Sequence, residues 1–232
     1  MPAVVTCMFN PCGWRSRMRN YECFAEGLRA AGCKLYCVEL SYGGAAPACS
    51  ADVKIDLRGD ARHILWQKEA LLAVGLARAA ADGHEILAIL DADVLVPPSW
   101  GRAVREAVGG APGNFALHAA SHWKRIFSGG GSGEWESFAV NRKSPFAGGG
   151  WAARAELWRS FRLFDLCVVG GGDCALVQGL GAACSGPFHF PQLYPPTHPA
   201  LRNPWRARVH TLPRLDGLGA LPVAVAMTGH GQ

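Results

Sequence analysis

The sequence predicts an α/β protein with a mostly parallel central sheet flanked by helices, followed by a smaller mixed region. Strand-like apolar runs and amphipathic helical stretches alternate over the first hundred residues, in the order strand, helix, strand, helix, strand. This order is typical of parallel sheets. Two of the runs, Ala3–Met8 and Ile86–Leu90, are almost wholly apolar, as expected of buried strands. Glycines follow both helical stretches, where helices commonly end.

The first half of the chain contains elements with clear start and stop signals. The opening strand, Ala3–Met8, precedes a helix predicted over Ser16–Ala31, and a second strand is predicted over Leu35–Leu40. Asp60 can act as the N-cap of a long helix that closes at Gly83. The apolar face of that helix is formed by Ile64, Leu65, Leu71, Leu72, Leu76 and Ala79.

The second half is less regular. The glycine-rich stretch 129–133 is either a plain linker or a mobile flap over a ligand. The proline- and arginine-rich segment 186–214 indicates an extended or poorly ordered arm. Regular elements are predicted at Ser99–Val108 (helix), Phe115–Ala119 (strand), Ala155–Phe161 (helix), Leu166–Val169 (strand) and Cys174–Leu180 (helix).

Composition excludes several classes of protein. No window reaches the roughly 18 uninterrupted apolar residues of a membrane span, and the first residues do not resemble a signal peptide. Nine scattered cysteines and no Asn-x-Ser/Thr site argue against a secreted disulfide framework, so we expect a cytoplasmic protein with reduced thiols. The net charge of +5 comes mostly from dispersed arginines. That pattern favours an anionic small molecule or a membrane surface over nucleic acid.

Three predicted strands end in polar residues. The first runs into Phe9-Asn10, the second ends at Glu39 and the third at Asp91. Open parallel sheets bind ligands beyond the carboxyl ends of their strands. We therefore expect these residues to face one crevice.

Asp91-Ala92-Asp93 is the most informative motif in the chain. Two closely spaced carboxylates at the end of a buried strand can meet hard divalent cations and phosphates. The alternative is that the pair only solvates a strand end or caps the next segment of the chain.

Two glycine-rich motifs occur in the second half. Gly148, Gly149 and Gly150 permit close backbone approach to a ligand, and Trp151 offers a flat face for sugar stacking; the same residues could form an ordinary turn. Asp173, after three more glycines, opens a predicted helix. It is either an N-cap or a general base that takes a proton from an acceptor hydroxyl.

Further charged residues have two interpretations each. Lys68 is either solvated or in contact with a phosphate or nucleotide. Arg15 and Arg17 lie just after the first strand, where a loop and helix start suit an anion. His230 could complete a metal site begun by Asp93, or be exposed near the chain end. His118 and His122 do not make a ready chelate, because a strand is predicted there.

In this order the motifs resemble those of glycosyltransferases with the GT-A fold, a Rossmann-like α/β architecture, and particularly small family-2-like members. The resemblance covers most of residues 3–182, and its specificity comes from the ordered set. The matching segments are Phe9-Asn10-Pro11, Trp66-Gln67-Lys68-Glu69, Leu90-Asp91-Ala92-Asp93, Gly148-Gly149-Gly150-Trp151, Gly170-Gly171-Gly172-Asp173 and His230-Gly231.

The resemblance implies a role for each motif. Asp93, supported by Asp91, would bind Mn²⁺ or Mg²⁺ bridging the diphosphate of a UDP- or GDP-sugar, with His230 as a further ligand. Donor contacts would come from Phe9, Asn10, Glu39, Lys68, Asp91 and Ala92. Gly149, Gly150 and Trp151 would shape the sugar and acceptor pocket. Asp173 would activate the hydroxyl of a glycan, a lipid-linked acceptor or a small molecule for inverting transfer.

The resemblance also implies an organisation within one domain, residues 1–232. Residues 1–110 would bind the nucleotide sugar, and residues 111–232 would form the acceptor side.

Three other functions share part of the pattern. Phosphatases of the haloacid dehalogenase type use Asp-x-Asp, but usually on the first strand and followed by a pair such as Gly-Thr. A sugar-phosphate nucleotidylyltransferase should show a glycine-rich phosphate loop after its first strand, which Asn10-Pro11-Cys12-Gly13 does not provide. A non-catalytic carbohydrate- or nucleotide-binding module would not need Asp173.

Overall fold

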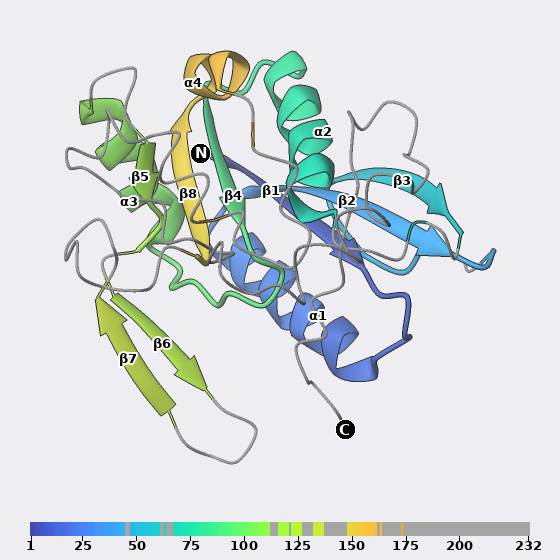
Figure 1. The fold of residues 1–232 in the computed structure, drawn as a ribbon. Helices are drawn as coiled ribbons and strands as arrows, with labels where there is room; N and C mark the ends of the chain where they lie inside the picture. Colours follow the sequence, from blue (N-terminus) through green and yellow to red (C-terminus); the bar gives the residue numbers. More distant parts are fainter. Residues whose placement is uncertain are drawn as a thin grey trace, which may run out of the picture.

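The computed structural model describes residues 1–44, 47–60, 63, 67–111, 116–120, 122–126, 132–136, 148–161, 163 and 173. In this part of the chain a six-stranded sheet has the order β3-β2-β1-β4-β8-β5 (Figure 1). Its strands are β1 (Ala3–Phe9), β2 (Lys34–Tyr42), β3 (Val53–Gly59), β4 (Ile86–Leu90), β8 (Gly150–Arg154) and β5 (Ala116–His118). β6 (His122–Ile126) and β7 (Ser132–Glu136) form a separate antiparallel pair.

The sheet is mostly parallel, as predicted. β1 through β4 run in one direction, whereas β8 is antiparallel to both β4 and β5. The α/β class is therefore confirmed. The residues predicted to form a strand at 166–169 and a helix at 174–180, the arm at 186–214 and His230 lie outside the described residues.

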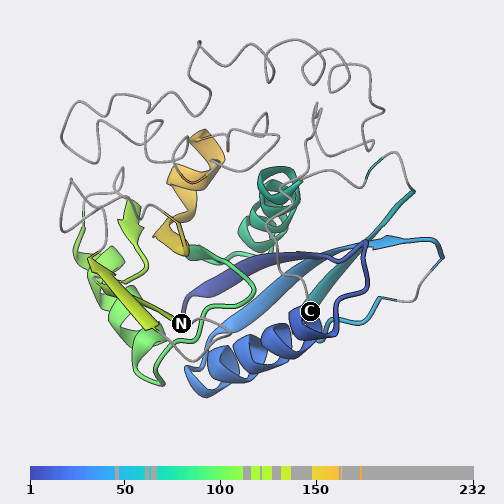
Figure 2. The same cartoon turned by 60° about the horizontal axis from the view of Figure 1, so that its bottom comes forward.

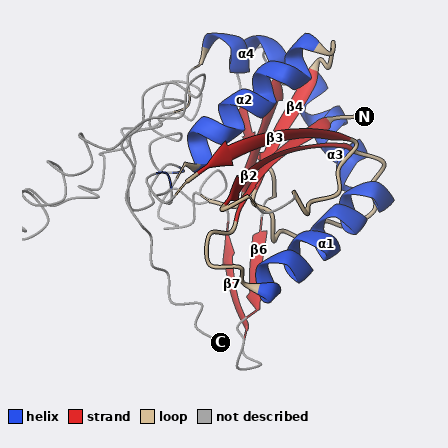
Figure 3. Ribbon diagram, turned by 90° about the vertical axis from the view of Figure 1, so that its right-hand side faces the viewer, coloured by secondary structure: helices blue, strands red, loops and turns tan. Residues whose placement is uncertain are grey.

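Helices cover both faces of the sheet (Figures 2 and 3). α2 (Lys68–Ala81) and α4 (Ala155–Ser160) pack on one face, where Leu71, Leu76 and Trp158 are buried. α1 (Arg15–Ala30) and α3 (Trp100–Gly110) pack on the other. Strands buried on both faces read as continuous apolar runs, which explains why β1 and β4 were predictable from sequence.

β3 is a strand that the sequence analysis missed. Its side chains alternate, with Val53, Ile55 and Leu57 packing on the core and charged residues between them. This period of two is typical of a half-buried strand, and β3 lies at the edge of the sheet. The Asp-Ala-Asp motif therefore follows the fourth strand along the chain, not the third.

The predicted start of the second long helix is also wrong. α2 begins at Lys68, after Gln67. Asp60 instead follows the last residue of β3, and its backbone N–H donates to the ring of His63. Ile64 and Leu65 lie outside the described residues. Lys68 is thus the first residue of α2.

No helix among the described residues is long and apolar enough to span a membrane.

Candidate functional site

The site lies where β1 and β4 part at their carboxyl ends. Their ladder runs only from Ala3–Leu87 to Val5–Ile89, although β1 continues beside β2 to Phe9. Beyond the last pair, the buried hydroxyl of Thr6 donates to the Leu90 carbonyl at 2.8 Å. The chain leaves β1 for α1 on one face, and reaches β4 from α2 on the other face. Such a switch in connection direction is where open α/β sheets bind ligands.

Asp91 and Asp93 lie on a tight turn directly after β4. The Asp91 N–H donates to the Gly149 carbonyl at 3.0 Å, and the Val94 N–H donates back to the Asp91 carbonyl at 3.2 Å. The side chain of Asp93 is exposed, whereas Ala92 packs on the core beneath α1. Although Asp93 as a whole is exposed, the protein around its carboxylate removes part of the hydration of that group; this loss of hydration, followed by the Asp91 charge, raises the pKa of Asp93.

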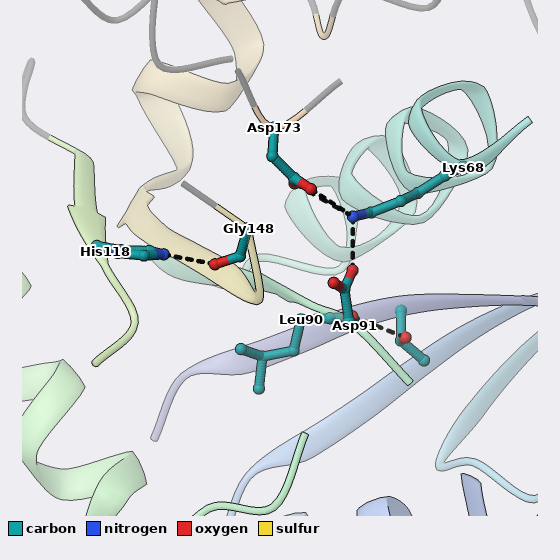
Figure 4. A network of polar contacts seen from close by, with 7 residues as sticks. Lys68, Leu90, Asp91, His118, Gly148 and Asp173 are labelled. Carbon is teal, nitrogen blue, oxygen red and sulfur yellow. Dashed lines mark hydrogen bonds and ion pairs between the residues drawn. The ribbon is translucent and has the colours of Figure 1, made fainter. Parts of the chain in front are cut away.

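Lys68 joins the turn to Asp173. Its Nζ lies 2.6 Å from Asp91 Oδ1 and 3.2 Å from both carboxylate oxygens of Asp173 (Figure 4). Only 12% of the Lys68 side chain is exposed. Burial by itself would lower the pKa of Lys68, but Asp173 and Asp91 outweigh it and hold that pKa well above its ordinary value. The predicted solvated role for Lys68 is therefore wrong.

Asp173 comes into this cluster from 105 residues further along the chain. Burial raises its pKa, and the Lys68 ammonium opposes the rise. A Cβ atom added to Gly148 would lie 3.1 Å from Asp173 Oδ2, so glycine allows the backbone to pass close to this carboxylate. Gly149 adopts φ +90°, which glycine tolerates best.

Gly150 and Trp151 belong to the core and not to a pocket. Gly150 pairs with Leu90, and a side chain there would collide with Leu90 and the Ile89 carbonyl. Trp151 has no exposed surface, and its ring stacks on His118 with centroids 4.6 Å apart. The expectation that Trp151 offers a face for sugar stacking does not agree with this geometry.

His118 supports the glycine loop, a role that the sequence analysis did not assign to it. Its Nε2 lies 2.6 Å from the Gly148 carbonyl, which can only accept, so the ring donates from Nε2 (Figure 4). Burial lowers the pKa of His118, which favours the neutral ring. No local spacing signals this contact, because Gly148 is 30 residues away.

Glu39 has a structural role in place of the predicted nucleoside contact. Its carboxylate accepts hydrogen bonds from the backbone N–H groups of Ala48 and Cys49, at 2.8 and 2.9 Å. Lys54 lies 3.6 Å from the same carboxylate. These contacts hold the segment that crosses from β2 to β3, so the Glu39 carboxylate is already engaged by the protein itself.

The end of β1 is organised around Asn10 and Phe9. The Asn10 side chain makes two hydrogen bonds to the backbone of Trp14, both 3.0 Å, and so shapes the loop before α1. Phe9 is buried, and the Arg17 guanidinium lies over its ring at 5.2 Å. Arg17 Nε is buried and has no hydrogen-bond partner in the described part of the chain.

Asp91 and Asp93 are the two carboxylates of the turn after β4, and the described residues contain no group of three or more His, Cys, Asp or Glu side chains that could hold a metal ion. Mg²⁺ commonly binds through one or two protein carboxylates, together with water and substrate phosphates. Asp91 and Asp93 therefore fit a divalent ion that arrives with a diphosphate.

No protein-family model matches the sequence, and no curated protein does. Among solved structures, one similar chain is from Desulfovibrio desulfuricans and is provisionally named a nucleotide-diphospho-sugar transferase. The two chains share 10% identity over 78% of each, with a TM-score of 0.40. A structural similarity at this TM-score does not indicate the function of this chain.

Proposed function

We propose that this protein is a glycosyltransferase that moves a sugar from a nucleotide-diphosphate donor, UDP- or GDP-linked, to an acceptor hydroxyl. The observation that carries the proposal is the convergence of Asp91, Lys68 and Asp173 where β1 and β4 separate. The cluster combines a carboxylate turn suited to a diphosphate-bound metal with a buried carboxylate suited to proton transfer.

Asp93 and Asp91 would hold Mn²⁺ or Mg²⁺, with Asp93 as the principal ligand because Asp91 Oδ1 already contacts Lys68. When bound, the ion neutralises charge on the departing nucleoside diphosphate. His230 stays a proposed further ligand. Asn10 stays the proposed nucleoside contact at the end of β1.

Asp173 would act as the general base. In an inverting displacement, the acceptor oxygen forms a bond to the anomeric carbon while the bond from that carbon to the diphosphate oxygen breaks. The diphosphate leaves with the electron pair, and the acceptor proton passes to Asp173. A carboxyl whose pKa is raised by burial is better suited to this transfer than an exposed one.

The direct test is release of nucleoside diphosphate from a panel of UDP- and GDP-sugars with Mn²⁺. Turnover of at least one donor supports the proposal. Release of inorganic phosphate from sugar phosphates would favour a phosphatase. Tight nucleotide binding without turnover of any donor would favour a binding module.

Two variants separate the assigned roles. Asp93→Ala should lose Mn²⁺-dependent donor binding, measured by calorimetry, because its carboxylate is the principal ligand. Asp173→Asn should keep donor binding and lose transfer by about 100-fold or more, the usual contribution of a general base. Glu106→Ala, on the exposed surface of α3, is the control and should change neither. Transfer at the parental rate by Asp173→Asn would remove Asp173 as the base.

A further inference from the structure

Lys68 lies between the proposed metal-binding turn and the proposed base. It is the first residue of α2, its side chain is largely buried, and its three N–H donors face two acids from distant segments. Asp91 follows β4, and Asp173 lies 82 residues beyond it. The ammonium therefore ties the metal-binding turn to the proposed base (Figure 4).

The charges in the cluster indicate how the Lys68 contacts would affect metal binding. Asp91, Asp93 and Asp173 would together carry three negative charges when ionised, and Lys68 offsets one of them. Its Nζ contacts Asp91 Oδ1 directly. A divalent ion bound to the same carboxylate meets a positive charge a few ångströms away, in a setting where water screens only part of the repulsion.

We propose that Lys68 is a built-in counter-cation that competes with the divalent metal ion for Asp91. Without metal it holds Asp91 and Asp173 together as a positioning residue. Metal binding at Asp91 has to displace or share this contact, so Lys68 weakens metal affinity while it keeps Asp173 beside the donor site. The inference rests on the proposed function for the identity of the metal-binding turn.

A purely structural role makes the opposite prediction. If Lys68 only anchored Asp173, its removal would loosen the site, and metal affinity would fall or stay the same. If Lys68 competes with the metal, removal of its charge strengthens metal binding.

The test is Mn²⁺ affinity of the full chain, measured without donor by calorimetry or by electron paramagnetic resonance of the free ion. Lys68→Met removes the charge and keeps much of the side-chain volume. Lys68→Gln is a second neutral variant that keeps hydrogen-bond donors for the two acids. Both should bind Mn²⁺ about tenfold more tightly than the parent, since a like charge near the ion has been removed.

Lys68→Arg keeps the charge and is the matched control, with Mn²⁺ affinity expected within about threefold of the parent. Unchanged or weaker Mn²⁺ binding by both Lys68→Met and Lys68→Gln, with a native near-ultraviolet circular dichroism spectrum, would overturn the inference.

Failure of the inference and failure of the proposed function give different results. If the parent releases nucleoside diphosphate but the neutral variants do not tighten Mn²⁺ binding, only the counter-cation role is lost. If no donor is turned over but the neutral variants bind Mn²⁺ more tightly, the counter-cation role holds and the transferase proposal fails.

Discussion

At the residue scale, the buried carboxyl of Glu69 links folding to pH. Glu69 follows Lys68 in the first turn of α2 and is 6% exposed. Burial raises its pKa to about 7 from an ordinary value of 4.5, although the Lys68 charge opposes the rise. The sequence analysis placed Glu69 only within a family-like segment, because no pattern indicated that an acid at a helix start would be buried.

We predict that Glu69 makes the protein less stable as the pH rises from about 4.5 to about 7. In this window the unfolded chain has released the Glu69 proton while the folded chain retains it, so ionisation favours unfolding. Glu69→Gln should remove this dependence and increase the free energy of unfolding at pH 8 by about 3 kcal/mol. At pH 4 the variant and the parent should have similar stability.

Urea unfolding at several pH values measures this effect. Glu106→Gln makes the same chemical change on the exposed surface of α3 and should leave the pH profile unaltered. A parental pH profile in Glu69→Gln would contradict the prediction.

At the element scale, the position of α2 against the sheet depends on Gly75. Gly75 is buried midway along α2, and a Cβ atom there would collide with the side chain of Val5 on β1. The glycine lets the helix lie close to the sheet, and the same helix carries Lys68 at its start. The amphipathic pattern predicted a helix here, but not the close approach.

Gly75→Ala should therefore lower the free energy of unfolding by about 1–3 kcal/mol, because Val5 is branched and held within the sheet. Gly109→Ala is the matched control, since Gly109 is also helical but has nothing within 4 Å of an added Cβ. It should leave stability unchanged or raise it by up to about 1 kcal/mol, because alanine favours helix. Thermal or urea unfolding of both variants measures the difference; equal effects would contradict it.

At the scale of the whole molecule, the two halves predicted from sequence share one sheet. β8 comes from the second half and lies between β4 and β5. Trp158, from α4, donates from its indole nitrogen to the Leu87 carbonyl of β4 at 3.0 Å. Trp151 and Trp158 both belong to the core on the α2 face. Residues 1–110 thus lack part of their own core.

A fragment of residues 1–110 should consequently fail to fold cooperatively. Without β8 and α4, β4 would lose its neighbour on one side and expose apolar surface that the full chain buries. Circular dichroism during urea titration should show no sigmoidal transition for the fragment, whereas the full chain should show one. A cooperative transition in the fragment would show that the first half is an independent folding unit.

The family-like motifs differ in how far the structure agrees with their predicted roles. Lys68 begins α2, Asp91 and Asp93 follow β4, and the structure brings Asp91 and Asp173 to the ammonium group of Lys68. Glu39 was predicted to end a strand but lies within β2, where its carboxylate holds a crossover segment. Trp151 belongs to a family-like motif but fills the core. A motif specifies residue types and their spacing. It does not specify which of these side chains become buried when the chain folds.

The sequence by itself determined the α/β class, the central strands β1 and β4, and the placement of two carboxylates at a strand end, because continuous apolar runs and helical periodicity are local signals. Only the tertiary structure decided that Lys68 joins Asp91 to Asp173, that β8 lies between β4 and β5, and that the Thr6 hydroxyl donates to the Leu90 carbonyl. These contacts join residues that are distant in sequence, and they depend on how helices and strands pack in space. No local pattern encodes such contacts.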